Sequence, residues 1–392
     1  MNKSDARRAS ASSTRPSMRL LPQLEAMQPT LIRQLHEAKP PGAIDLGMGQ
    51  PKLAPPPLLV AAMQAASSNW AAYSSNVGLR ELRERIAEAN DAHPDEVIVC
   101  AGSAQALFML ISSMLAPGDE LLVPDPGYPV YPRIAQFCGA TPVPYPLAAP
   151  GFGLDVDALL AKLSPKTRLV VLNNPSNPTS SIASAQSLAA LCTALAERGV
   201  PYLSDEVYAS LDYRSPGAPS VRLRAYSHEG FTVDSLSKSH ALMGWRLGWL
   251  IGPRKLCQQL VVVQQMMLSC APVPAQHAAV HAFSPEGLQA AALIRQTLAA
   301  RRAIALEGLR SCPVPMPTCE GGLYCFIDVR HLSNGDDKRL AFSLLEHGVV
   351  LIPGSAFGEN GRGHLRLSFG AKEEDLREGI TRLRQGLEAI SC

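Results

Sequence analysis

The sequence carries almost no net charge and has no long apolar run. Its 392 residues include 36 lysines and arginines against 34 aspartates and glutamates, which leaves a formal net charge of +2. A balance this close to neutral argues against a polyanionic partner, and we expect no nucleic acid binding. The longest apolar runs, such as the one around residues 261–263, are broken by Gln or Cys well short of the roughly 20 residues that a membrane span needs. We therefore expect no membrane partner either.

The 9 cysteines form no CxxC pair. An odd number of scattered cysteines in a long chain fits a reducing compartment better than a disulfide framework, and we assign no metal ligands. Residues 1–19 are rich in Ser, Ala and Arg and lack the apolar core of a secretory signal. They predict a flexible N-terminal tail, with an organelle transit peptide as the alternative interpretation. The default prediction is a cytoplasmic protein.

The middle of the chain alternates short β-rich runs with longer helical ones. Strands are predicted at 97–100, 120–123, 169–173, 202–204 and 232–235, and helices at 104–115, 130–138 and 183–198. This alternation predicts a mostly parallel sheet covered by helices on both faces. In such a sheet ligands lie beyond the carboxyl ends of the strands, so polar residues that follow the strands are site candidates.

The two ends of the chain are patterned differently. The N-terminal part predicts a helix at 20–38, a short strand within 43–57, and helices at 58–67 and 78–90. After Pro253 a long helical region extends to about 305, followed by strands at 322–329, 349–351 and 364–369 and a helix at 338–347. The C-terminal remainder is typical of a smaller α+β domain.

Residues 235–248, SLSKSHALMGWRLG, hold the candidate catalytic lysine. Lys238 lies between small hydroxyl residues, and Arg246 follows in a glycine-rich context. An amine that attacks an aldehyde must be at least partly unprotonated, which neighbouring positive charge and desolvation both favour. The stretch therefore suits a lysine that forms a Schiff base beside a bound phosphate. The alternative is a polar loop followed by a buried glycine turn.

A second candidate site opens the helix that follows the strand at 97–100. Gly102, Ser103 and Ala104 lie where backbone N–H groups at a helix N-terminus form a ready anion site. A simple strand-to-helix turn is the alternative. Since the segment is neither GxGxxG nor a P-loop, dinucleotide and ATP binding lose support.

Polar residues also follow two later strands. Asn177 lies in NNPSNPTS after an apolar run, and its amide suits a ligand oxygen, although the Asx-Pro turns there are self-sufficient. Asp205 and Tyr208 place a carboxylate and a phenol at the same sheet edge, where Asp is also a common helix N-cap.

Taken together, these motifs carry a family resemblance. In chain order they are YSSNVGLRELR, AGSAQAL, DPGYPVY, NPSNPTS, SDEVY, SLSKSHALMGWRLGW, GGLYCFIDV, VLIPGSAFG and HLRLSFG. The chain resembles the fold-type I pyridoxal-phosphate enzymes, specifically the class I/II aminotransferases related to aspartate aminotransferase, from about residue 45 to 369. Nine motifs in the same order make a chance match very improbable.

The resemblance implies an α/β fold with two domains. The large domain would hold a mostly parallel seven-stranded sheet sandwiched by helices and bind pyridoxal 5'-phosphate, and the small domain would be α+β. Residues 1–19 would form the tail, 20–50 would join the small domain, 51–275 would form the large domain, and 276–392 would form the rest of the small one.

The resemblance also implies roles around the cofactor ring. Lys238 would carry the cofactor as an internal aldimine and shuttle the substrate proton. Asp205 would pair with the pyridine nitrogen and keep it protonated. Asn177 and Tyr208 would hydrogen-bond the ring's phenolic oxygen, and Tyr128 would stack on the ring, with a surface aromatic in a turn as its alternative.

Two further groups complete the implied site. The phosphate would be held by Gly102, Ser103, Ala104, Ser235 and Arg246. In this family a tyrosine of the neighbouring subunit completes the phosphate site, and Tyr73 matches it, so a homodimer with shared active sites is implied. Arg366 would clamp the substrate α-carboxylate, together with Gly49 and Asn177. An exposed strand arginine is the alternative for Arg366.

The chain departs from the family pattern at two places. Ser180 stands where the family commonly has glycine, and Lys52-Leu53 where it commonly has Asp-Phe. Lys52 either meets an acidic substrate side chain or is an ordinary solvated lysine.

We expect a homodimeric enzyme that moves the amino group of an L-amino acid to a 2-oxo acid by a ping-pong route. A lyase, decarboxylase or amino-acid oxidase on the same fold is the first alternative, because the bond cleaved depends on pocket geometry. A non-catalytic regulatory protein is the second, but no helix-turn-helix module precedes the first motif. A nicotinamide-dependent dehydrogenase lacks its fingerprint. Aromatic, aliphatic and acidic substrates all stay open.

Overall fold

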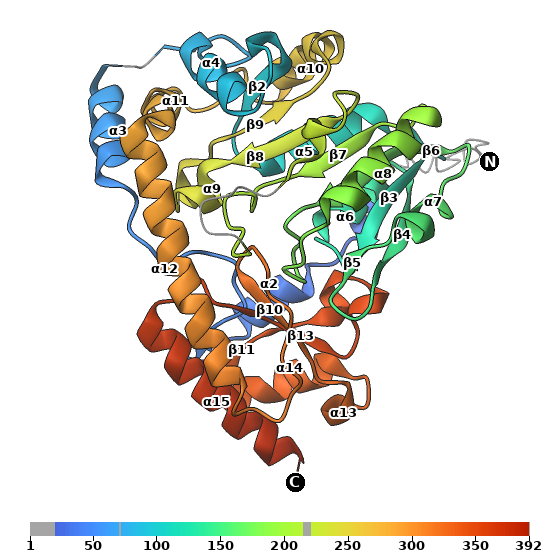
Figure 1. The fold of residues 1–392 in the computed structure, drawn as a ribbon, viewed down its shortest axis with the longest axis vertical. Helices are drawn as coiled ribbons and strands as arrows, with labels where there is room; N and C mark the ends of the chain where they lie inside the picture. Colours follow the sequence, from blue (N-terminus) through green and yellow to red (C-terminus); the bar gives the residue numbers. More distant parts are fainter. Residues whose placement is uncertain (1–19, 70–71, 215–220, 392) are drawn as a thin grey trace, which may run out of the picture.

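A computed structural model of the protein describes residues 20–69, 72–214 and 221–391. The tail predicted at 1–19 lies outside these residues. Figure 1 shows a large sheet flanked by helices and a smaller part with a sheet of its own, with the long helix α12 (Pro285–Leu309) running along one side of both. Within the described residues, no helix is long and apolar enough to cross a membrane.

The large sheet has the strand order β2-β9-β8-β7-β6-β3-β4-β5. Strands β8, β7, β6, β3 and β4 are mutually parallel, whereas β9 runs antiparallel to both β2 and β8, and β5 is antiparallel to β4. The strands are β2 (Val97–Cys100), β3 (Glu120–Asp125), β4 (Thr141–Ala148), β5 (Gly153–Leu154), β6 (Thr167–Asn173), β7 (Tyr202–Asp205), β8 (Phe231–Ser235) and β9 (Gly248–Ile251).

Helices cover both faces of this sheet because its central strands are apolar on both sides. In β6, Leu169 and Val171 pack into the core formed with α5, α6 and α10, while Val170 and Leu172 pack into the core formed with α7 and α8. Such continuous apolar strands are typical of buried parallel sheets. The helices of this part are α3 (Pro57–Asn69), α4 (Arg80–Ala89), α5 (Ser103–Met114), α6 (Val130–Phe137), α7 (Val156–Leu160), α8 (Ala185–Glu197), α9 (Leu236–Ser239), α10 (Arg254–Met267) and α11 (Val273–Val280).

The smaller part combines the two ends of the chain. Its sheet has the order β10-β13-β12, and β1 pairs with β11 beside it. Leu35 and Leu46 from the N-terminal segment lie in the same core as Leu365 and Leu383. The elements are α1 (Pro22–Ala26), α2 (Leu31–Glu37), β1 (Ile44–Asp45), β10 (Tyr324–Asp328), α13 (Arg330–Ser333), α14 (Asp337–Glu346), β11 (Val349–Val350), β12 (Ile352–Pro353), β13 (His364–Ser368) and α15 (Glu373–Ser391). Short 3-10 helices lie at 94–96, 223–225, 243–245, 281–283, 354–357 and 359–361.

The mostly parallel α/β fold is confirmed, with two corrections of detail. The sheet has eight strands rather than seven, because β5 adds a two-residue edge. The helix predicted at 20–38 is two helices, because α1 ends at Ala26 and α2 begins at Leu31. The hydroxyl of Thr30 caps α2 by accepting a hydrogen bond from Arg33 N at 3.2 Å. The domain boundary after residue 275 stays a prediction; residue 275 lies inside α11, which packs against α3 and α4.

Candidate active site

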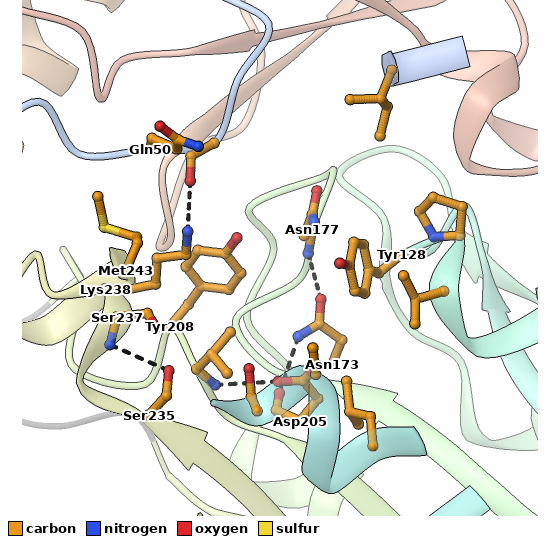
Figure 2. A pocket seen from close by; sticks show the side chains of 18 of the residues that line it. Gln50, Tyr128, Asn173, Asn177, Asp205, Tyr208, Ser235, Ser237, Lys238 and Met243 are labelled. Atoms are coloured by element: carbon orange, nitrogen blue, oxygen red, sulfur yellow. Dashed lines mark hydrogen bonds between the residues drawn. The ribbon is translucent and has the colours of Figure 1, made fainter. Parts of the chain in front are cut away.

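A cavity of roughly 390 Å³ lies at the carboxyl ends of β6, β7 and β8. Residues from both parts of the molecule line it. Figure 2 shows Lys238 and Tyr208 on one side, Asn177 and Tyr128 on the other, and Asp205 at the floor. This is the position where parallel α/β sheets bind ligands.

Lys238 is positioned by the short helix α9, which begins directly after β8. Its Nζ donates to the carbonyl oxygen of Gly49 at 2.6 Å, so the lysine reaches across to the N-terminal segment. Burial, followed by the charges of Arg366 and Arg246, lowers the pKa of Lys238 from 10.5 to about 8. An amine with this pKa is partly neutral near pH 7, as a nucleophile requires.

Asp205 ends β7 beside Asn173, which ends β6, and their Cα atoms are paired in the sheet register. The carboxylate is 3% exposed and accepts a hydrogen bond from the hydroxyl of Tyr131 at 2.7 Å. Burial raises the pKa of Asp205 to about 6, although the Tyr131 bond acts in the opposite direction. A buried carboxylate held in this way suits a cationic N–H group facing it from the cavity.

An anion site lies where α5 begins. Gly102 precedes the helix with a φ of +83°, and no side chain caps the first N–H groups. A Cβ at Gly102 would collide with the guanidinium of Arg246, so the glycine is needed for this close approach. Arg246 donates to the carbonyl oxygens of Met243 and Ala101 at 2.9 and 3.4 Å, and no carboxylate among the described residues pairs with it. Free N–H groups and an unpaired cation together favour a phosphate.

Arg366 projects from β13 into the other side of the cavity. It is 3% exposed and donates to Asn177 Oδ1 at 2.8 Å and to the Gly47 carbonyl at 2.6 Å. Its guanidinium lies 4.3 Å from the ring centre of Tyr324 and 4.6 Å from that of Phe357. The Nε atom is buried without a hydrogen-bond partner. A buried guanidinium with an unused N–H donor is suited to binding a carboxylate.

A pair of tyrosines joins the two parts beside Lys238. The hydroxyls of Tyr208 and Tyr324 are 2.7 Å apart and hydrogen-bonded. The Oγ of Ser180 accepts from the backbone N of Tyr324 at 3.2 Å, and Ser180 adopts a φ of +58°. Glycine adopts that left-handed conformation most readily, which fits the glycine that the family commonly has here, and the Ser180 hydroxyl makes a hydrogen bond that glycine would lack.

A network of buried charges lies behind the site. Arg222 forms ion pairs with Glu206 at 3.0 Å and Asp234 at 3.2 Å, next to Asp205 and Ser235 in the chain. Burial raises the pKa of Asp234 to about 7, with Arg222 acting in the opposite direction. This network links the ends of β7 and β8 through residues that do not line the cavity.

The structure gathers most of the predicted site residues around one cavity. Those that line it are Gly49, Ser103, Ala104, Tyr128, Asn177, Asp205, Tyr208, Ser235, Lys238, Arg246 and Arg366. Gly102 lies directly behind Arg246. Tyr73 is 85% exposed and does not line the cavity of its own chain. Sequence reasoning missed Asn173, Tyr131 and Tyr324, although each stands inside a motif that it singled out.

The residues present fit pyridoxal phosphate. The unpaired Arg246 and uncapped α5 match its phosphate, the buried Asp205 carboxylate matches its pyridine nitrogen, and Lys238 has the depressed pKa that its aldehyde needs. Burial raises the pKa of Tyr128 to about 12, which keeps its hydroxyl protonated and its ring uncharged in the cavity.

Comparison with known proteins gives one family. The family model described as "Aminotransferase class I and II" matches residues 41–383. The chain is 33% identical over 349 residues to a probable N-acetyl-LL-diaminopimelate aminotransferase of Bacillus subtilis, covering 87% of this chain and 88% of the relative. It is 34% identical over 352 residues to an arginine–pyruvate transaminase of Pseudomonas aeruginosa, covering 86% and 88%. A solved Thermus thermophilus aspartate aminotransferase double mutant is similar with a TM-score of 0.87 and 29% identity, over 94% of this chain and all (100%) of that one.

Proposed function

The chain belongs to the class I and II aminotransferases and is a pyridoxal-phosphate-dependent aminotransferase, and we propose that Lys238 is the residue that binds the cofactor aldehyde and moves the substrate proton. The observation that carries this assignment is the partly buried Lys238 amine, with its pKa lowered to about 8, in one cavity with Asp205, Arg246 and Arg366. The substrates are an amino acid and a 2-oxo acid. The lyase, decarboxylase and oxidase alternatives are not favoured, because the relatives are named as transaminases.

The cofactor, when bound, supplies an electron sink for the negative charge that develops at the substrate α-carbon. Asp205 would accept from the pyridinium N–H, and the Tyr131 hydroxyl holds the carboxylate in place for it. Asn177 and Tyr208 would donate to the phenolic oxygen, and Tyr128 would cover the ring face. The phosphate would lie between Arg246, Ser235 and the first N–H groups of α5 at Ser103 and Ala104.

Arg366 would hold the α-carboxylate of the substrate in a bidentate pair, using Nε and one terminal nitrogen. Because Asn177 and Gly47 already fix the guanidinium, the substrate enters a preorganised site. Lys238, which lines the same cavity, would then take the proton from the substrate α-carbon onto its Nζ atom and release it again.

Borohydride reduction of the loaded protein tests the lysine assignment. We expect the peptide that carries Lys238 to gain the mass of the reduced cofactor. The Lys238→Ala variant should gain none, while Lys255→Ala, a change in the α10 helix away from the cavity, should label like the wild type. Label on any other lysine of the wild type would refute the assignment.

We also propose a homodimer in which the partner's Tyr73 completes the phosphate site. This is supported by the exposure of Tyr73, 85%, and by its position outside its own cavity. Mixing refolded Tyr73→Ala and Lys238→Ala subunits tests the arrangement, because each mixed dimer would regain one complete site. Recovery of cofactor affinity and activity in the mixture is expected, whereas simple averaging of the two parents would exclude sharing.

A cytoplasmic location belongs to the same proposal. Eight cysteines of the described residues are unpaired, and most are buried. This state suits a reducing compartment.

A further inference from the structure

We infer that the amino acid used by this enzyme carries an uncharged apolar side chain, recognised by Ile32, Pro129 and Val130. These three residues are called the apolar wall below. The inference rests on the proposed function of Lys238 and Arg366 and adds the substrate class to it.

The charges of the cavity are already assigned. Among its lining residues only Asp205, Lys238, Arg246 and Arg366 carry charge. The cofactor engages the first three and the substrate α-carboxylate engages Arg366. No lining cation of the described chain is left for a second carboxylate, and an unpaired carboxylate buried there would be costly.

The apolar wall contains residues from both parts of the molecule. Ile32 lies in the first turn of α2, while Pro129 and Val130 stand at the start of α6. The two segments are tied together, because Arg133 of α6 donates to the carbonyl oxygen of Gln28 at 2.6 Å. The three residues line the same cavity, and Pro129 and Val130 directly follow Tyr128, which would cover the cofactor ring.

Two of the polar groups near the wall already have partners. Thr30 lines the cavity, but its hydroxyl caps α2. Arg33 is paired with Glu37 on the exposed side of α2. Arg133 does not line the cavity. A substrate side chain that reaches this wall thus meets methyl and methylene groups, whose contacts discriminate by size and polarity.

The strongest rival involves a neighbouring cavity of roughly 190 Å³ that shares Met48 and Gln50 with the main one. Lys39 and Lys52 line it. A long acidic side chain that passed Gln50 would meet cations there. The experiment must therefore distinguish a substrate side chain at the apolar wall from one in the second cavity.

The test is a substrate profile of the cofactor-loaded enzyme. Leucine, methionine, phenylalanine, aspartate, glutamate and arginine are supplied singly, and conversion of the cofactor to its amine form is followed by absorbance. We expect kcat/KM for the best apolar amino acid to exceed that for aspartate and glutamate by about 100-fold or more. Calorimetry with unreactive analogues gives a readout without turnover, and 4-methylpentanoate should bind more tightly than succinate.

Two variants of matched charge locate the recognition. Ile32→Lys should lower kcat/KM for leucine by about 10-fold or more. It should also reduce the ratio of kcat/KM for leucine to kcat/KM for aspartate. Ala38→Lys adds the same charge at the exposed end of α2 and should leave the profile unchanged. Should Ile32→Lys fail to fold, the wild-type profile and the calorimetry still decide.

Faster conversion of aspartate or glutamate than of the apolar amino acids, or tighter binding of succinate than of 4-methylpentanoate, would overturn the inference. If the Lys52→Gln variant then lost this preference for acidic substrates, the second cavity would be its cause. Preference for arginine would overturn it as well. If no amino acid converts the cofactor at all, the proposed function itself has failed, which is a distinct result.

Discussion

The depressed pKa of Lys238 predicts how the cofactor-free protein reacts with its cofactor. With a pKa of about 8, roughly one amine in eleven is neutral at pH 7, against about one in 3,000 for a pKa of 10.5. The structure therefore gives Lys238 about 300 times more of its reactive form than an exposed lysine has. The rate of cofactor uptake should rise with pH, reach half of its maximum near pH 8 and level off above about pH 9.

Stopped-flow absorbance of the cofactor-free enzyme mixed with pyridoxal phosphate, from pH 6 to 10, measures this profile. Nα-acetyl-lysine in the same buffers provides the control. The cofactor ionises in the same way in both reactions, so the ratio of the two rates leaves only the difference between the two amines. Arg366→Gln should move the plateau to higher pH, because the charge of Arg366 lowers the pKa of Lys238. A rate that climbs steadily past pH 9.5 would refute the reasoning.

The same shift has a consequence for stability. Because the folded pKa lies below the unfolded one, the charged lysine destabilises the fold at low pH, and this penalty is relieved as pH rises from about 8 to 10.5. A difference of about 2.5 pKa units corresponds to at most about 3 kcal/mol. Lys238→Met should therefore raise the free energy of unfolding of the cofactor-free protein at pH 7, and the gain should fade above pH 10.

Three other changes are expected to have measurable effects. Arg222→Ala leaves two buried carboxylates unpaired and should lower the free energy of unfolding by about 3–5 kcal/mol in urea titrations at pH 7, where an effect below about 1 kcal/mol would contradict the buried network. Gly102→Ala forces a Cβ against Arg246 and should raise the Kd for pyridoxal phosphate about 10-fold or more; unchanged binding would count against the anion site. Tyr131→Phe removes a donor to Asp205 and should lower kcat about 10-fold with little change in KM, and a change confined to KM would argue for a different role of the carboxylate.

The parallel sheet and most of its helices could be predicted because their signals are local. The strand at 97–100 was predicted with the bounds that β2 has, and the helix at 130–138 differs from α6 by one residue. Strand β4 was missed because Pro142, Pro144 and Pro146 alternate along it. A strand tolerates prolines in that spacing when the missing N–H groups face the nearly free edge, where only β5 is added.

The candidate site was predictable where a residue follows a strand and stands in a motif, as with Lys238 and Asp205. Tyr131 and Tyr324 escaped because their importance comes from contacts made far along the chain. Tyr131 and Asp205 are 74 residues apart, and the bonded tyrosines Tyr208 and Tyr324 are 116 apart. Spacing in a single sequence does not reveal such contacts, because Tyr131 comes from α6 and Tyr324 from β10 of the smaller part.

The hydrogen bond from Arg366 to Gly47 closes a loop of 319 residues. Closing so long a loop costs conformational entropy before any contact repays it, so such contacts form late. The β7–β8 half of the site lies within residues 202–239 and needs no such closure. Synthesis runs from the N-terminus, so Lys238 and Arg246 are made before Arg366. The growing chain therefore contains the proposed lysine and phosphate-binding residues before the residue that we propose to orient an amino acid, and the proposed selectivity for substrate is the last of these properties to become available.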